Sequence, residues 1–177
     1  MWKEVFPVNV SRPTEPVTPE EFEAMDKDER LTYELIDGVV MMSPSPSREH
    51  QTISIKLSHK LMLNLANTDC QPLYEYDIKF DGNIFKPDVM VFCHDNDDLP
   101  EIIFEILSPS TRQKDILVKP IRYQAMGVKE YWIIDPKVKI IIVHDFINQT
   151  AESYGLGDTI QSKARPEISI TVADIFA

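Results

Sequence analysis

The sequence predicts an α/β protein with a mixed central β-sheet, helices packed against that sheet and an additional β-hairpin layer. Residues 102–107 and 131–135 are largely apolar runs, which are typical of strands covered on both faces. A helical segment over residues 111–126 lies between them, and a helical crossover predicts that the two strands are parallel neighbours. Asp37-Gly38 between two β-prone runs predicts the hairpin, because both turn positions favour a positive φ.

Length and composition predict one soluble globular domain that spans residues 1–177. The chain is long enough to bury a sizeable core, and its apolar and charged fractions are 43% and 27%. Residues 1–17 contain three prolines and little periodicity, so we expect an N-terminal arm. No apolar run approaches the roughly 20 residues of a membrane span, and the N-terminus lacks the apolar core of a signal peptide. We therefore expect a cytoplasmic protein without a membrane partner.

The cysteines and the net charge narrow the function classes. Cys70 and Cys93 do not have a metal-binding spacing, so we expect free thiols in a reducing cytoplasm. The formal net charge of −11 argues against a protein that coats nucleic acid in general. This net charge does not exclude a local site that binds phosphates through metal ions.

Two helices are predicted in the N-terminal half. Thr18 and Glu21 form a capping box that begins a short helix, and a Ser/Pro loop precedes a second helix from about Arg48 to Asn67. His50 lies one turn before the apolar stripe of the second helix and on nearly the same face. His50 could make a structural hydrogen bond at the start of the helix, or it could have a functional role. The stripe itself recurs every four residues, as Ile53, Leu57, Leu61 and Leu65.

Two acidic residues lie on predicted strands of this half. Glu34 lies on the opposite face of the first hairpin strand from its apolar neighbours, where a solvated charge is the plain alternative. Further strands are predicted over residues 73–80 and 84–92. Pro87 lies in the second of these, and because proline cannot donate to a strand ladder, it is expected where strand pairing begins or is interrupted. Asp88 therefore lies where a strand enters an apolar run, and it either ends the exposed part of that strand or belongs to a site.

The segment over residues 111–126 predicts an amphipathic helix with a break. Asp115, Lys119 and Tyr123 are spaced four apart and project from one face. Pro120 removes a backbone donor and disfavours helical geometry at the residue before it, so we expect a kink near residues 116–119. The opposite face is expected to pack on the sheet through Leu117, Ile121 and Ala125. Strands are predicted to follow over residues 130–135, 138–146 and 168–171, with a short one around 153–154.

Glu105 interrupts the apolar run of the central strand. An ionised carboxylate that is buried without a partner costs several kcal/mol, unless the strand is an edge strand and the carboxylate faces water. Together with Glu34, Asp88 and the helical Lys119 it suggests a constellation for phosphodiester hydrolysis. A divalent ion held by carboxylates neutralises phosphate oxygens and activates water, and a lysine adds positive charge. Mg²⁺ prefers a few carboxylates plus waters, so we expect Asp88 and Glu105 to share one ion with the carbonyl of Ile106.

These motifs resemble the Uma2 (DUF820) family of the PD-(D/E)xK nuclease superfamily, which is abundant in cyanobacteria. The resemblance covers roughly residues 18–155 and is most specific between Glu105 and Pro136. It implies a restriction-endonuclease-like fold, Mg²⁺- or Mn²⁺-dependent cleavage of DNA, and a homodimer. The matching blocks are Tyr-Glu-Leu-Ile-Asp-Gly-Val-Val at 33–40, Pro-Asp-Val at 87–89, Phe-Glu-Ile-Leu-Ser-Pro-Ser-Thr at 104–111, Asp115-x3-Lys119-x3-Tyr123, and Gly-Val-Lys-Glu-Tyr-Trp-Ile-Ile-Asp-Pro at 127–136.

The resemblance also implies roles for single residues. Asp88 matches the aspartate of the PD motif and Glu105 the acid of the (D/E)xK motif, which are the expected metal ligands, and Glu34 matches an upstream acid. The superfamily lysine would stand at Leu107, and in this family the next helix usually supplies it, which points to Lys119. Pro120 departs from the family pattern directly after that lysine. Supporting positions that match the family are Asp115 and Tyr123, for orientation and substrate contact, and His50, without an assigned role.

Two hypotheses from different classes follow. The first is a magnesium-dependent endonuclease that acts on DNA through Glu34, Asp88, Glu105 and Lys119. The second is a catalytically silent module that keeps the nuclease fold for binding or assembly. Nucleases normally present a basic groove to phosphates, which the acidic net charge does not favour. Binding of a divalent ion would distinguish the two, because a ligand that binds the native state raises its stability.

Overall fold

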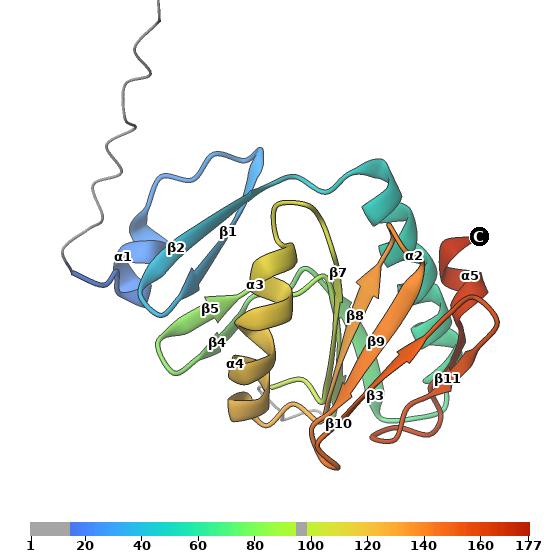
Figure 1. Cartoon of the computed structure of the whole chain (residues 1–177). Coiled ribbons are helices and arrows are strands. Elements are labelled where there is room, and N and C mark those ends of the chain that lie inside the picture. The colour runs from blue at the N-terminus through green and yellow to red at the C-terminus, as the bar shows by residue number, and fades with distance from the viewer. Residues whose placement is uncertain (1–14, 95–98) are drawn as a thin grey trace, which may run out of the picture.

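The fold is described by a computed structural model that covers residues 15–94 and 99–177. Most of the predicted N-terminal arm, residues 1–17, therefore lies outside the described residues. The centre of the molecule is a six-stranded sheet (Figure 1). Its strands, in spatial order, are β10 (Thr150–Tyr154), β9 (Ile140–Asp145), β8 (Glu130–Asp135), β7 (Ile102–Ile106), β6 (Val89–Cys93) and β3 (Cys70–Tyr74).

The sheet is mixed, as predicted. β7 and β8 pair in parallel, whereas the other neighbouring strands of this sheet pair antiparallel. The β7 strand lies inside the sheet between β6 and β8, and all five of its residues are buried. The prediction of a central Glu105 strand with a parallel neighbour is confirmed, and its continuous apolar run reflects a strand that is covered on both faces.

Helices cover both faces of this sheet (Figure 1). On one face α2 (Arg48–Asn64) packs its apolar stripe against alternate residues of β7, such as Phe104 and Ile106. On the other face lie α3 (Arg112–Leu117) and α4 (Lys119–Met126), whose buried side chains contact the core around Ile103. The α2 helix ends three residues earlier than predicted. Among the described residues, no helix has the length and apolar character needed to cross a membrane.

A second sheet forms the predicted hairpin layer. Asp37 and Gly38 both have positive φ, at 53° and 71°, which confirms the predicted turn. Gly38 is also required by space, because a Cβ there would lie 2.3 Å from the Cβ of Pro16. The strands of this sheet, in spatial order, are β2 (Val39–Pro44), β1 (Leu31–Ile36), β5 (Asn83–Phe85) and β4 (Ile78–Phe80). The helix α1 (Pro19–Ala24), with the predicted capping box, packs on this sheet through Phe22.

The predicted strands over residues 73–80 and 84–92 are each divided between the two sheets. β3 and β6 belong to the six-stranded sheet, whereas β4 and β5 form an outer hairpin of the four-stranded sheet. The division falls at Glu75, which has a φ of 46°, and at Pro87, which cannot donate to a strand ladder. Asp88 therefore lies at the junction of the sheets, directly before β6.

The predicted orientation of the helical segment 111–126 is wrong. Leu117 and Ile121, expected to pack on the sheet, are 59% and 65% exposed, and Ala125 is exposed as well. The polar face is buried instead, because its side chains find charged and hydroxyl partners beneath the helices. The expected break is confirmed, since α3 ends at Leu117 and α4 begins at Lys119.

The C-terminal segment returns to the α2 face of the central sheet. The hairpin β11 (Thr159–Gln161) and β12 (Ser169–Thr171) leads into α5 (Val172–Phe176). Buried residues of this helix, Val172 and Ile175, complete the core on that face. This segment closes the fold on the side away from α3 and α4.

The prediction of two free thiols is also wrong. Cys70 and Cys93 form a disulfide, because the antiparallel pairing of β3 and β6 places them directly opposite one another with a Cα–Cα distance of 4.0 Å. Their separation of 23 residues in sequence carries no sign of this contact. The cytoplasmic location, which the free thiols supported, remains a prediction.

We expect reduction of the Cys70–Cys93 disulfide to lower the free energy of unfolding by about 3 kcal/mol. The bond restricts the unfolded chain by closing a loop of this length. Urea denaturation with and without dithiothreitol measures the effect, and the Cys70→Ser/Cys93→Ser variant should be insensitive to the reductant. Labelling of both thiols in unreduced, denatured protein would contradict the pairing.

Candidate functional site

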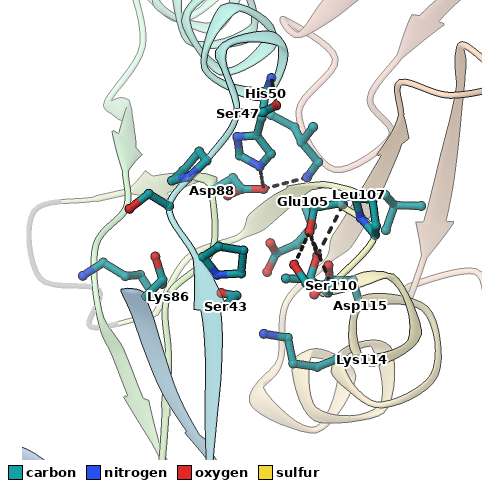
Figure 2. Close-up of a pocket in the computed structure, with 18 of the residues that line it drawn as sticks. Ser43, Ser47, His50, Lys86, Asp88, Glu105, Leu107, Ser110, Lys114 and Asp115 are labelled. Carbon is teal, nitrogen blue, oxygen red and sulfur yellow. Dashed lines mark hydrogen bonds and ion pairs between the residues drawn. The ribbon is translucent and has the colours of Figure 1, made fainter. Parts of the chain in front are cut away.

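A pocket of about 580 Å³ opens where the four-stranded sheet meets the end of β7 and the start of α2. The pocket is lined by residues 43–47, which run from the end of β2 to the cap of α2, and by the β7–α3 connection, residues 107–111 (Figure 2). Both connections are rich in serine and proline. Acidic residues from several different elements lie inside the pocket: Glu34, Glu49, Glu75, Asp88, Glu105 and Asp115.

Glu105 projects from β7 toward α3 and α4 and is only 4% exposed. Its Oε1 accepts hydrogen bonds from Lys119 Nζ at 2.6 Å and from the Tyr123 hydroxyl at 2.9 Å. Burial raises the pKa of the Glu105 carboxyl well above its ordinary value, and the nearby acids raise it further, although Lys119 opposes both effects. Burial and the nearby acids therefore favour a proton or another cation at Glu105.

Lys119 is the first residue of α4, and its ammonium is buried among three acids. Nζ lies 2.9 Å from Glu34 Oε1 and 3.3 Å from Asp115 Oδ1, in addition to its contact with Glu105. Burial lowers the pKa of Lys119, but the neighbouring carboxylates raise it by more than burial lowers it. The pKa of Lys119 is therefore well above its ordinary value. Lys119 is therefore a permanent cation of this site.

Pro120 does not prevent Lys119 from reaching the pocket. The proline lies in the first turn of α4, where its missing N–H breaks no helical hydrogen bond. The helix break that precedes it separates α3 from α4. The departure from the family pattern is thus compatible with the buried position of the lysine side chain.

Glu34 reaches the site from β1 of the other sheet. Its carboxylate accepts a hydrogen bond from the backbone N–H of Lys86 at 3.0 Å and pairs with both Lys114 and Lys119. Burial alone would raise its pKa, but the two lysines and the hydrogen bonds lower the pKa to about 2. Glu34 is therefore ionised over the physiological range, and the solvated-charge reading of this residue is excluded.

Asp88 lies at the pocket wall with one oxygen held by two donors. Its Oδ2 accepts hydrogen bonds from the backbone N–H of Ile106 at 2.7 Å and from His50 Nε2 at 3.0 Å (Figure 2). His50 is positioned at the start of α2, where Ser47 caps its backbone N–H. The other ring nitrogen of His50, Nδ1, is buried without a hydrogen-bond partner among the described residues. We assign the proton to Nε2, since a carboxylate accepts and cannot donate.

The structure brings the sequence-predicted residues together around this pocket. Glu34, His50, Asp88, Glu105, Ile106, Asp115 and Lys119 all line it. Tyr123 lies behind Glu105, to which it donates a hydrogen bond. Ile106 contributes its backbone N–H to Asp88, and the role of its carbonyl as a metal ligand remains a prediction.

Two residues that the sequence motifs do not assign to the acidic site complete it. Lys114 pairs with Glu34 although its position next to Asp115 places it off the predicted helix face, and no simple spacing signals it. The Tyr131 hydroxyl donates to the backbone carbonyl of Asp115 at 2.9 Å. Parallel pairing of β7 with β8 places Tyr131 on the same sheet face as Glu105, so strand alternation could have identified it.

Two carboxylates of the pocket, Asp88 and Glu105, could serve as ligands of a metal ion. In the described part of the chain, no three His, Cys, Asp or Glu side chains are grouped as a metal cage. Mg²⁺ is usually held by one or two carboxylates together with waters and substrate phosphates. Oδ2 of Asp88 and Oε1 of Glu105 carry the hydrogen bonds described above, which leaves the second oxygen of each carboxylate as a candidate ligand.

Comparisons with known proteins identify the family and the fold. The Uma2 family, described as "Putative restriction endonuclease", matches residues 19–173. An uncharacterized protein of Synechocystis sp. is 30% identical over 116 residues, which cover 59% of this chain and 60% of that protein. The fold resembles a crystal structure from Anabaena variabilis, described as a putative nuclease belonging to DUF820, with a TM-score of 0.78 and 21% identity. That match covers 91% of this chain and 98% of the other.

We expect the ion pairs of Glu34 to make stability depend on pH below neutrality. Its pKa is lower in the folded chain, about 2, than its ordinary value of 4.5, so its contribution is complete above pH 4.5 and is lost as the pH falls toward 2. The full loss is up to about 3 kcal/mol. Urea denaturation between pH 3 and 7 measures it. The stability difference between wild type and Glu34→Gln should shrink as the pH falls, and a constant difference would contradict this assignment.

Proposed function

The chain belongs to the Uma2 family, and from this premise we propose that it is a magnesium-dependent nuclease that hydrolyses phosphodiester bonds in DNA. The family predicted from the sequence motifs is confirmed by the match over residues 19–173. The observation that carries the proposed reaction is the convergence of Glu34, Asp88, Glu105 and Lys119 in one pocket. These residues come from β1, the position directly before β6, β7 and α4, so only the folded chain assembles them.

Asp88 and Glu105 are the proposed ligands of Mg²⁺ or Mn²⁺, with the Ile106 carbonyl as a further oxygen. When bound, such an ion neutralises phosphate oxygens and lowers the pKa of a bound water. His50 and the Ile106 N–H orient Asp88 by holding its Oδ2, so Oδ1 would be the oxygen available to a metal ion. Tyr123 orients Glu105 in the same way through Oε1.

Lys119 supplies positive charge beside the reacting phosphate. Because its pKa is well above the ordinary value, its ammonium does not act as a general base. Glu34 and Asp115 hold the ammonium in place before substrate arrives, so no reorganisation is needed when negative charge develops in the transition state. Proton transfer from the attacking water is therefore assigned to solvent or to the substrate phosphate.

We expect purified protein to nick plasmid and to cleave single-stranded DNA in Mg²⁺ or Mn²⁺. Glu105→Gln and Asp88→Asn should reduce cleavage by at least about 10³-fold, since each removes a charged ligand of the ion. Gel assays of plasmid and oligonucleotide measure the rates. Equal cleavage by wild type and Glu105→Gln would identify a contaminating nuclease.

The same variants separate the nuclease from a silent binding module. Mg²⁺ should raise the stability of wild type by about 2.7 kcal/mol at a concentration 100 times its Kd, and should not stabilise Asp88→Asn. A chain that gains no stability from Mg²⁺ or Mn²⁺ would contradict the proposed metal site and favour the binding or assembly module. The homodimer and the cytoplasmic location remain predictions.

We expect His50→Leu to weaken Mn²⁺ binding by about 10- to 100-fold, because it removes a donor that orients Asp88. His50→Gln retains an N–H donor and should restore much of the affinity. Calorimetric titration with Mn²⁺ measures the Kd, and thermal unfolding reports on folding. His59→Gln, on an exposed position of the same helix, is the matched control. Unchanged Mn²⁺ affinity in folded His50→Leu would refute the orienting role.

A further inference from the structure

We propose that the free edge of β2 pairs with the same edge of a second copy of this chain, so that the two four-stranded sheets join across a two-fold axis into one continuous sheet. The inference goes beyond the proposed function and does not depend on it. It is drawn from the pairing of β2 and not from the resemblance to a family. Three features carry it: the open edge of β2, the neutral character of this edge, and a register in which the strand complements itself.

The first feature is the open edge. β2 is an outer strand of its sheet, with β1 on one side (Figure 1). In an antiparallel pair, alternate residues direct their N–H and C=O groups toward the partner strand and the residues between them direct these groups away. Ser45 N–H donates to the Arg30 carbonyl at 3.2 Å, whereas Leu35, the partner of Val40, pairs with β5 on its other side. This alternation directs the N–H and C=O groups of Val40 and Met42 to the free edge.

The two ends of this edge are already provided for. The Gly38 carbonyl accepts a hydrogen bond from the Val17 N–H at 2.9 Å, and Pro44 has no N–H to offer. Among the described residues, no other strand pairs with β2 on this side, so the outward groups of Val40 and Met42 are without a strand partner. The available part of the edge is therefore the middle of β2.

The second feature is the neutral character of β2. Natural proteins protect the edges of sheets with charged side chains or prolines, which discourage pairing with another chain. Such residues are present on the other edge strands of the two larger sheets: Lys79 on β4, Glu152 on β10 and Pro72 in the middle of β3. β2, Val39–Pro44, carries no charged side chain, and its proline is its last residue. This edge lacks the usual protection against pairing.

The third feature selects a second copy as the partner. When β2 pairs antiparallel with itself around Met41, Val40 faces the partner's Met42 and Met42 faces the partner's Val40. Each of these two residue pairs exchanges two backbone hydrogen bonds. A two-fold axis places identical surfaces against each other, and a strand without charge brings no like charges together. Val39 and Met42, which are 52% and 62% exposed in the single chain, are partly covered by this pairing.

The same register brings the second copy to the pocket. Glu34 lies directly opposite Met41 in the β1–β2 pair, so both residues belong to the pocket face of the sheet. A two-fold axis perpendicular to the sheet keeps both pocket faces on one side, and the two Glu34 backbones are then three strand spacings apart, about 14 Å. The partner's Val39 lies beside Ser43, which lines the pocket. The second copy therefore contributes to the wall of each pocket.

Sedimentation velocity of the full chain between about 5 and about 300 µM measures the association. We expect a monomer that forms a dimer of twice 20.4 kDa as the concentration rises. Met42→Pro should give a folded monomer, because an edge strand tolerates a residue without an outward N–H, whereas pairing with a second copy needs that donor. Met42→Lys should raise the dissociation constant at least about 10-fold, because a charge protects an edge. The matched control is Met62→Lys on α2, since Met62 is also 62% exposed. Thermal unfolding reports on the fold of each variant.

Cysteine cross-linking tests the register. Met41 and the partner's Met41 form a pair without backbone hydrogen bonds, with Cα atoms about 4.5 Å apart, which is within the reach of a disulfide. Met41→Cys should therefore give a covalent dimer on a non-reducing gel after mild oxidation. Met62→Cys should not. Cys70 and Cys93 are paired within one chain, so the wild type should give no covalent dimer.

The inference is overturned by a wild-type chain that stays monomeric over this range, by a dimer that persists in folded Met42→Pro and Met42→Lys, or by Met41→Cys that cross-links no more than Met62→Cys. A monomer with the Val40 and Met42 amides protected from hydrogen exchange would also overturn it, since another segment of the same chain would then cover the edge. Its failure is distinguishable from that of the proposed function. Mg²⁺-dependent cleavage by a monomer, lost in Glu105→Gln, would keep the nuclease and refute the dimer. A dimer paired through β2 that cleaves no DNA would keep this inference and refute the nuclease.

Discussion

The Lys119 ammonium, buried beneath α4 among three carboxylates, is the interaction on which the arrangement of this protein depends. It joins Glu34 of the four-stranded sheet to Glu105 of the six-stranded sheet and to Asp115 of α3. Removing one partner of a buried ion pair lowers the stability of a protein by about 3–5 kcal/mol. These ion pairs therefore hold β1, β7 and α3 in position around α4. The same ammonium is also the charge that a phosphate would meet in the pocket.

Burial of this cation explains why the helical segment 111–126 turns its polar side inward. Asp115, Lys119 and Tyr123 satisfy one another and Glu105 in the interior, whereas Leu117 and Ile121 are left on the surface. Hydrophobic burial alone would favour the opposite orientation. The helix break at Val118 contributes, since it allows α3 and α4 to present their polar residues to one point.

The pocket lies at the junction between the two sheets. The chain leaves the six-stranded sheet after β3, forms the outer hairpin of β4 and β5, and returns through Pro87 to Asp88 and β6. Asp88 is thereby held at the end of a rigid strand by donors from α2 and β7. These two hydrogen bonds fix the orientation of the Asp88 carboxylate, which the proposed role as a metal ligand requires.

The sequence by itself determined the element types, the parallel pairing of β7 and β8, the hairpin at Asp37-Gly38, the family and the set of candidate acids, because periodicity, turn chemistry and local motifs are properties of short segments. Only the tertiary structure decided which helix face is buried, that Cys70 meets Cys93, and that Lys114 and Tyr131 complete the site. Those outcomes depend on sheet register and on charges brought together from distant segments, and neither is encoded in the spacing of neighbouring residues.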